Sequence, residues 1–157
     1  LIAGEEPELC VRMRAAGWRV WRLDDEMTLH DAAMTHFSQW WKRSLRTGFS
    51  YAEGAQLHGA TPEQHWVHES RSALVWGLAL PLAIVAAALV AGPWALLGVL
   101  IYPLQVTRLL VRERGPWRTR LARATFLVLG KFPEACGVVK FLAHRVSGTS
   151  GALIEYK

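Results

Sequence analysis

Three carboxylates stand within four residues near the start of the chain, at Glu5, Glu6 and Glu8. A carboxylate within hydrogen-bond reach of a hydroxyl can take its proton, which is the task of a general base. The same residues also suit the first turn of a helix, where negative charge complements the positive end of the helix dipole. The spacing alone leaves both interpretations open, a catalytic acid/base site and a helix cap.

Local signals predict the elements that must position these carboxylates. Residues 8–16 are predicted as a helix, because Pro7 suits a first turn and Gly17 suits the position after a last turn. The pattern of residues 18–23 predicts a strand. After a polar turn, a helix resumes near Thr35. The order of helix, strand, loop and amphipathic helix predicts the end of an α/β domain.

The composition indicates a soluble part joined to a membrane part. The chain has 157 residues, is 52% hydrophobic and 20% charged, and contains eight tryptophans. Its net charge is +5, with basic residues gathered at 42–46 and 112–120. A basic surface fits nucleic acid or a membrane, and because these residues flank an apolar run, they favour the membrane. Cys10 and Cys136 are too far apart for a disulfide framework or a zinc-binding motif.

The apolar run predicts a membrane hairpin. Residues 73–107 include no charged residue and no histidine. As one straight helix they would span about 52 Å, well beyond the hydrocarbon core of a bilayer. The Gly92-Pro93 pair is a natural break, so we predict crossings at 73–90 and 93–111 with their basic ends in the cytoplasm. The alternative is a buried hairpin of a soluble protein, which a chain this short could hardly cover.

The segment after the hairpin begins with a basic loop. Apolar positions then recur along residues 121–146, interrupted by Lys131, Glu134, Lys140 and Arg145. These charges make a third crossing unsuitable. We predict an amphipathic helix that lies in the membrane interface and is kinked near Pro133.

Part of the N-terminal region resembles a known enzyme family. The residues concerned are Gly4-Glu5-Glu6, Glu8-Leu9, Arg12-Met13-Arg14 and Gly17-Trp18. They resemble the "GED-x-(D/E)-L-x-x-R-(L/M)-x-x-x-G" segment of family-2 glycosyltransferases with the GT-A fold. His30-Asp31 and Gln39-Trp40-Trp41-Lys42-Arg43 extend the resemblance, which covers residues 4–54 in detail.

The resemblance implies a fold class and a domain organisation. The fold would be an α/β fragment, the end of a GT-A, Rossmann-like catalytic domain, followed by a transmembrane α-helical hairpin and an amphipathic interfacial helix. Residues 1–58 would close the catalytic domain and 59–72 would link it to the membrane. Two transmembrane helices would occupy 73–111, and 112–157 would form the basic loop, the interfacial helix and a tail.

The resemblance also implies roles for the acidic residues. Glu6 takes the place of the catalytic base of an inverting, hexosyltransferase-like enzyme, although the family more often has Asp there. Glu5 would orient the site, and Glu8 would be a helix-end charge. His30 would touch a divalent metal, Mg or Mn, or the diphosphate, because a neutral imidazole can bind such an ion. Asp31 would orient His30.

Gln39, Trp40, Trp41 and Arg43 are the expected acceptor-binding residues. Processive relatives carry Gln-x-x-Arg-Trp, and because the order differs here, the segment is similar to the non-processive branch. Aromatic faces suit sugar C–H surfaces, and Arg43 or Arg46 could pair with phosphate. The alternative is an interfacial helix with tryptophans at the headgroup level and basic residues facing anionic lipid. Both interpretations remain open.

The implied activity moves a sugar from a nucleotide sugar to a sugar or lipid-linked acceptor. It would serve polysaccharide or glycolipid synthesis at the inner membrane, with the catalytic part in the cytoplasm and membrane lipids, not nucleic acid, as partners. The Asp-x-Asp metal motif and the nucleotide-binding strands of the family are expected upstream, so we expect this chain to be a C-terminal fragment that is inactive alone. The rival interpretation is a non-catalytic membrane anchor or assembly subunit.

Overall fold

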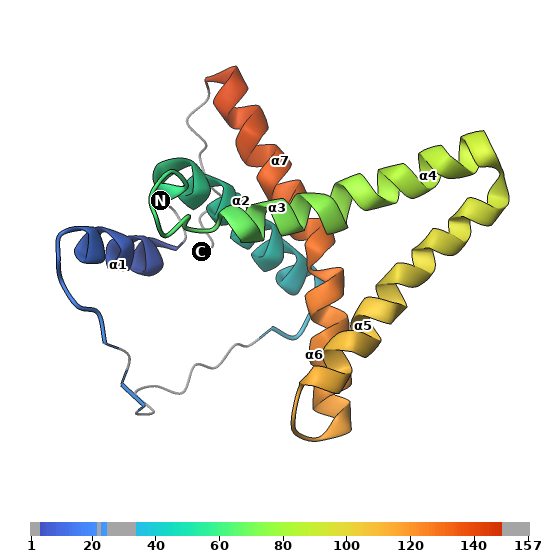
Figure 1. The fold of residues 1–157 in the computed structure, drawn as a ribbon, viewed down its shortest axis with the longest axis horizontal. Helices are drawn as coiled ribbons and strands as arrows, with labels where there is room; N and C mark the ends of the chain where they lie inside the picture. The colour runs from blue at the N-terminus through green and yellow to red at the C-terminus, as the bar shows by residue number, and fades with distance from the viewer. Residues whose placement is uncertain (1–3, 22, 25–33, 149–157) are drawn as a thin grey trace.

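The structure, a computed structural model, describes residues 4–21, 23–24 and 34–148. These residues form helices joined by short connections, apart from an extended stretch after the first helix (Figure 1). In chain order the elements are α1 (Glu5–Ala15), α2 (Phe37–His58), α3 (Val67–Leu74), the π-helical turn η1 (Val75–Ala79), α4 (Leu80–Ala91), the 3₁₀ segment η2 (Pro93–Leu100), α5 (Ile101–Arg112), α6 (Trp117–Leu129) and α7 (Lys131–Ser147).

The predicted α/β fold is wrong for this part of the chain. Residues 18–21 and 23, which were expected in a strand, have no regular structure, and no strand occurs in the described ranges. Trp18, Trp21 and Leu23 are 68%, 78% and 68% exposed. A strand needs a neighbour that pairs its backbone N–H and C=O groups, and no described residue supplies one. The described residues therefore contain no part of a Rossmann-like sheet.

Helix α1 ends as the sequence predicts. Gly17 has φ 86°, and its N–H donates to Arg14 O while the N–H of Trp18 donates to Met13 O, both at 3.0 Å. These two bonds form a Schellman motif, which satisfies carbonyls that the helix end leaves open. The helix begins earlier than expected, so Pro7 lies in its first turn, where a missing N–H breaks no helical hydrogen bond.

Helix α7 lies at the centre of the fold, where it crosses α2 with almost no side chain between the two backbones (Figure 1). A Cβ on Gly137 of α7 would overlap Leu45 O and stand 2.6 Å from Phe49 N. Gly48 of α2 is in the reciprocal position, since a Cβ there would stand 2.5 Å from Glu134 Cα. Glycine at both positions is therefore what allows α2 and α7 to approach this closely.

The helical run Val67–Ala91, the first of two that are long and apolar enough to cross a membrane, crosses α7 in the same way. A Cβ on Gly77 would overlap Lys131 O and stand 2.7 Å from Ala135 Cβ. Small side chains also form the core beside these crossings, with Ala52, Ala73 and Val138 buried together. Helix α7 thus packs against both α2 and η1, which are distant from it in the chain.

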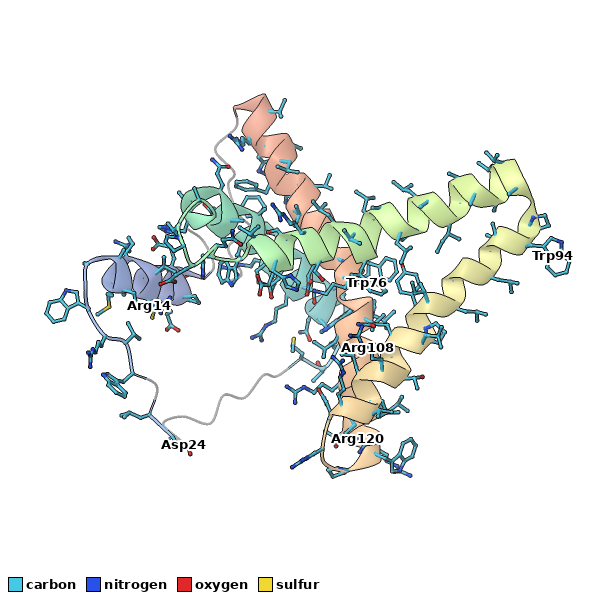
Figure 2. All side chains as sticks on the ribbon, viewed as in Figure 1. Arg14, Asp24, Trp76, Trp94, Arg108 and Arg120 are labelled. Atoms are coloured by element: carbon cyan, nitrogen blue, oxygen red, sulfur yellow. The ribbon has the colours of Figure 1, made fainter. Side chains whose placement is uncertain are left out.

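Two helical runs are long and apolar enough to cross a membrane, Val67–Ala91 and Pro93–Arg112. The first begins within the stretch that was expected as a linker. The runs meet at Gly92, whose φ is 96°, and project from the helical body as a V (Figure 1). Val90 and Trp94 near the tip are 90% and 80% exposed, and Figure 2 shows Trp94 at the far end from the rest of the chain. Such continuous apolar exposure fits a bilayer as the covering medium.

A hydrogen bond ties the two legs of the V together. In the wide turn η1, the N–H of Leu80 donates to Val75 O. If this hydrogen-bond pattern continued by one residue, the carbonyl of Trp76 would accept from the N–H of residue 81. That residue is Pro81, which has no N–H to donate. The hydroxyl of Tyr102, on the other leg, donates to Trp76 O at 2.7 Å. Tyr102 therefore satisfies the carbonyl that the proline leaves open.

The predicted interfacial helix is a packed central element instead. The run forms two helices, α6 and α7, separated at Gly130. Pro133 lies in the first turn of α7. In one continuous helix the carbonyl of Leu129 would need the N–H of residue 133, which proline does not have. The buried residues of α7 are Pro133, Ala135, Gly137 and Val138. Because α2 and α3 cover this face, it is not available to lie on lipid.

The substitution Gly137→Ala tests the crossing of α2 and α7. In an open helix it stabilises by up to about 1 kcal/mol, because alanine is the better helix former. Here the methyl group meets backbone atoms, so we expect a loss of about 1–3 kcal/mol. Thermal unfolding in detergent, followed by circular dichroism, measures the difference. Cys136→Ala, at an exposed neighbouring position, is the control and should unfold like the wild type. A Gly137→Ala protein as stable as the wild type would contradict the close crossing.

Candidate functional site

Trp66 holds the start of α1 against the turn between α2 and α3. Its φ of 57° is unusual for a bulky residue. The indole lies on Gly4, where a Cβ would overlap it, and on Gly54, where a Cβ would stand 2.5 Å from a ring carbon. Tyr51 meets the ring edge-on, with centroids 5.4 Å apart. Packing against both glycines holds the strained backbone of Trp66 in place.

Glu8 is the carboxylate of α1 that the fold buries, with 8% of the residue exposed. Its Oε1 lies 2.8 Å from His58 Nε2 at the end of α2, and Arg12 Nε donates to its Oε2 at 3.0 Å. The hydrogen bond with His58 lowers the pKa of Glu8, and Arg12 lowers it further. A carboxylate kept ionised by two partners is a weak proton acceptor. Glu8 therefore anchors α1 rather than acting as a base.

A second ion pair joins α1 to the same turn. Arg14 donates from Nε and Nη2 to the two carboxylate oxygens of Glu63, at 2.7 and 2.6 Å. This hydrogen-bonded pair lowers the pKa of Glu63 and raises the pKa of Arg14. Both side chains are partly open to water, so the pair adds orientation more than stability. Figure 2 shows Arg14 on α1, on the side of the helical body.

Glu5 and Glu6 lie in the exposed first turn of α1. Successive helical residues turn by about 100°, so Glu6 points about 160° away from Glu8 around the helix axis. Because Glu8 faces α2, Glu6 faces the opposite side. The side chains of Glu5 and Glu6 form no hydrogen bond or ion pair within the described ranges. Glu6 is thus a carboxylate at a fixed helix end that is open to a ligand.

His65 lies beside His58 and Trp66, close to the Glu8 anchor of α1. Its ring stacks on Trp66 at 4.3 Å, and its centroid is 6.3 Å from that of His58. Burial lowers the pKa of His65, and the charge of His58 lowers it further. His65 is therefore neutral at pH 7, and its buried Nε2 has no hydrogen-bond partner among the residues described.

Sequence reasoning missed this part of the site. It read Glu8 as a helix-end charge and placed residues 59–72 in a linker. The available signal was histidine density, because His58, His65 and His68 fall within a short stretch that also contains Trp66. Nothing in their local spacing identifies Glu8 as the partner of His58.

The expected metal ligand lies outside the described residues. His30 and Asp31 both fall in the range 25–33, of which nothing is described. Elsewhere, no group of three His, Cys, Asp or Glu side chains in the described ranges could hold a metal ion. The divalent ion that the resemblance implies therefore stays a prediction, because its expected ligand is not among the described residues.

Gln39 caps α2 from within. Its Oε1 accepts hydrogen bonds from the backbone N–H of Thr35 at 2.9 Å and of His36 at 3.1 Å. A side chain three residues into a helix that reaches back in this way satisfies donors that the helix start leaves open. The carbonyl oxygen of Gln39 is therefore already engaged, which reduces its value for binding a sugar hydroxyl.

The two tryptophans of α2 belong to an aromatic cluster. Trp40 meets Phe126 of α6 edge-on at 5.1 Å and lies 5.0 Å from Phe37. Trp41 lies 6.1 Å from Phe37. Both tryptophans are half-buried, whereas Arg43 is exposed.

The contact with α6 brings the two basic clusters to the same end of the molecule. The start of α2 carries Lys42, Arg43 and Arg46, and α6 follows the basic loop 112–116. Figure 2 shows Arg108 and Arg120 where α5 and α6 meet, at the opposite end of the second leg from Trp94. This is the charge distribution that the predicted hairpin topology requires.

The structure does not bring the acidic turn and the expected acceptor residues together. The acidic turn is anchored at His58, at the end of α2, and Gln39 lies at its start. At the rise of an α-helix these two positions are about 28 Å apart. One sugar ring cannot touch both ends of α2, and the acceptor-binding role of Trp40, Trp41 and Arg43 stays a prediction.

Comparison with known protein families, with characterised proteins and with solved structures found no match for this chain.

The pH dependence of α1 docking tests the anchors. Glu8 and Glu63 both have lowered pKa values in the folded chain, so their contribution is complete above the ordinary glutamate value of about 4.3 and is lost as the pH falls through the lower folded-state values. We expect the protection of α1 amides against hydrogen exchange, corrected for the intrinsic rate, to fall over that acid range.

The double variant Glu8→Gln/Glu63→Gln should show weaker protection of α1 at pH 7 and a flatter acid profile. Glu5→Gln, a change of the same kind at an exposed carboxylate of the same helix, should keep the wild-type profile. An unchanged profile in the double variant would mean that these pairs do not hold α1.

Proposed function

We propose that this chain contributes the membrane-attached, base-bearing part of a glycosyltransferase. The enzyme transfers a sugar from a nucleotide-sugar donor to a sugar or lipid-linked acceptor, in polysaccharide or glycolipid synthesis. Three observations support the proposal: the acidic pattern at Gly4–Trp18, the exposed position of Glu6, and the membrane-capable hairpin joined to the same helical body. The proposal does not depend on an α/β fold in this part of the chain.

The position of Glu6 is the observation on which the proposal chiefly rests. Of three adjacent carboxylates, Glu8 is ionised and buried against His58, whereas Glu6 faces away from α2 on an anchored helix. A base must reach its proton without being held by other donors. Glu6 meets that condition and Glu8 does not.

The chemistry assigned to Glu6 is proton removal during inverting transfer. Glu6 takes the proton of the acceptor hydroxyl as the hydroxyl oxygen attacks the anomeric carbon of the donor sugar. The new C–O bond forms on the face opposite the leaving group. The bond from the anomeric carbon to the diphosphate oxygen breaks, and the nucleoside diphosphate leaves with the electron pair. No metal-dependent step is assigned to the described residues, because they offer no ligand set.

The aromatic and basic start of α2 serves membrane docking in this proposal. It lies about 28 Å from the anchor of the acidic turn and beside the basic end of the hairpin. Tryptophans at the headgroup level and arginines facing anionic lipid suit that position. The hairpin then spans the inner membrane, with α1 on the cytoplasmic side.

A non-catalytic membrane anchor is the second candidate. It is favoured by the three ion pairs of α1, which assign a structural task to part of the acidic cluster. In that case the carboxylates would only hold and cap a helix.

The substitution Glu6→Gln separates the two candidates. It should be made in the natural protein that carries this sequence, in membranes, with matched expression. Glutamine keeps the size of the side chain but cannot take a proton, so we expect sugar transfer to fall by at least ~100-fold, the low end for a general base, with nucleotide-sugar binding unchanged. Asp24→Asn, a matched change at an exposed carboxylate, is the control. Near-normal transfer by Glu6→Gln would favour the anchor.

Cysteine labelling tests the topology. In a background with Cys10→Ser and Cys136→Ser, a membrane-impermeant maleimide should label Trp94→Cys in intact cells. It should label Arg114→Cys only after permeabilisation, because the positive-inside rule places the 112–116 loop in the cytoplasm. Labelling of Arg114→Cys in intact cells would reverse the orientation, and equal protection of both sites would argue against a crossing hairpin.

A further inference from the structure

A second surface of the helical body has the features of a ligand site. A cavity of about 390 Å³ lies where α2, α3 and α7 meet. Its lining residues are Ala52, Ala55, Gln56, Gly59, Val67, Ser70, Arg71, Leu74, Val138, Phe141, Leu142 and Arg145. None of the roles assigned above uses this cavity.

The polar side of the cavity suits an anion. Arg71 and Arg145 both line it, and no carboxylate does so among the described residues. Neither arginine has an ion-pair partner in the described ranges. Guanidinium groups bind phosphate oxygens through pairs of parallel hydrogen bonds, which makes two unpaired arginines a suitable phosphate site.

Ser70 gives a second, independent indication of a ligand. It is 9% exposed, and its Oγ is buried with no hydrogen-bond partner within the described part of the chain. A buried hydroxyl without a partner is costly. A ligand oxygen in the cavity would remove that cost by bonding to Ser70, and Gln56 on the same lining has an amide that can donate as well.

The rest of the lining is apolar. Leu74, Val138 and Phe141 form a hydrophobic wall next to the core. Free phosphate is fully hydrated and gains nothing from such a wall. A phospholipid joins a phosphate to hydrocarbon, so it can use both sides of the cavity.

The cavity also lies at the right place along the hairpin. Val67 and Ser70 are in the first turn of the helical run Val67–Ala91, the first of the two that could cross a membrane. If that run spans the bilayer, its first turn is at the headgroup level. This step depends on the membrane placement given under the proposed function, but not on sugar transfer.

We propose that this cavity binds the phosphate headgroup of an anionic phospholipid. Arg71 and Arg145 bind the phosphate oxygens, Ser70 donates its hydroxyl to one of them, and the glycerol end of the acyl chains lies against the wall formed by Leu74, Val138 and Phe141. The lipid then bridges α3 and α7 beside their crossing.

Lipid retention by the purified full chain tests the site. The chain is extracted from nanodiscs of equal parts phosphatidylglycerol and phosphatidylcholine, and the bound lipid is measured by native mass spectrometry. We expect phosphatidylglycerol to be retained by the wild type, and Arg71→Gln/Arg145→Gln to retain at least about tenfold less, as follows from losing charged hydrogen bonds. Arg19→Gln/Lys140→Gln removes the same charge at positions that do not line the cavity and should retain the lipid as the wild type does.

Further measurements distinguish a lipid phosphate from free phosphate and test the role of the Ser70 hydroxyl. Ser70→Ala should reduce retention without lowering the unfolding temperature in the absence of lipid, because it removes a buried hydroxyl that has no partner there. Millimolar inorganic phosphate should not displace the lipid. Displacement by phosphate, equal retention of both lipids, or equal loss in the two double variants would each overturn the proposal. Glu6→Gln should retain lipid normally whether or not it abolishes transfer, so failure of the lipid site and failure of the glycosyltransferase proposal give different results.

Discussion

The structure depends on the close crossing of helices at glycine. Gly137 and Gly48 let α7 and α2 meet backbone to backbone, and Gly77 does the same for α7 and the first membrane-capable helix. Helices that approach this closely gain van der Waals contact along the crossing without a large hydrophobic core. This suits a chain whose hairpin leaves most of its apolar side chains exposed. One central helix can thus join the hairpin to the helical body.

Because α2 is held by its crossing with α7, it rigidly connects two different surfaces of the chain. At its end, His58 holds Glu8 of α1, and at its start, Trp40 packs on Phe126 beside the basic residues. Because α7 fixes α2 near its middle, neither end can approach the other. The chain therefore keeps the anchor of the acidic turn and the aromatic, basic start of α2 about 28 Å apart. The family resemblance, taken from the sequence alone, assigns the acidic turn and the start of α2 to one site. In the structure, the length of α2 holds them apart.

Features set by neighbours in sequence could be predicted, and features set by distant partners could not. The cap at Gly17 and the break at Gly92 follow from local backbone preferences, which the sequence displays directly. The strand expected after Gly17 failed because a strand needs a partner, and the described chain offers none. Glu8 and His58 are 50 positions apart, so no spacing rule could have paired them. The interfacial helix was wrong because amphipathic periodicity predicts a buried face but not whether lipid or α2 covers it.

The placement of Glu6 follows from the anchoring of Glu8. Once Glu8 faces His58, helical geometry turns Glu6 away from α2, and the Arg14–Glu63 pair prevents α1 from rotating back. In the proposed reaction, the acceptor hydroxyl that reaches Glu6 must therefore approach from the side of α1 opposite α2. The same proposal requires the nucleotide-binding part of the enzyme to face that side, so that the acceptor hydroxyl lies between the donor and the first turn of α1. The ion pairs of α1 are thus compatible with the proposed catalysis, because they leave one carboxylate free and fix the direction in which it points.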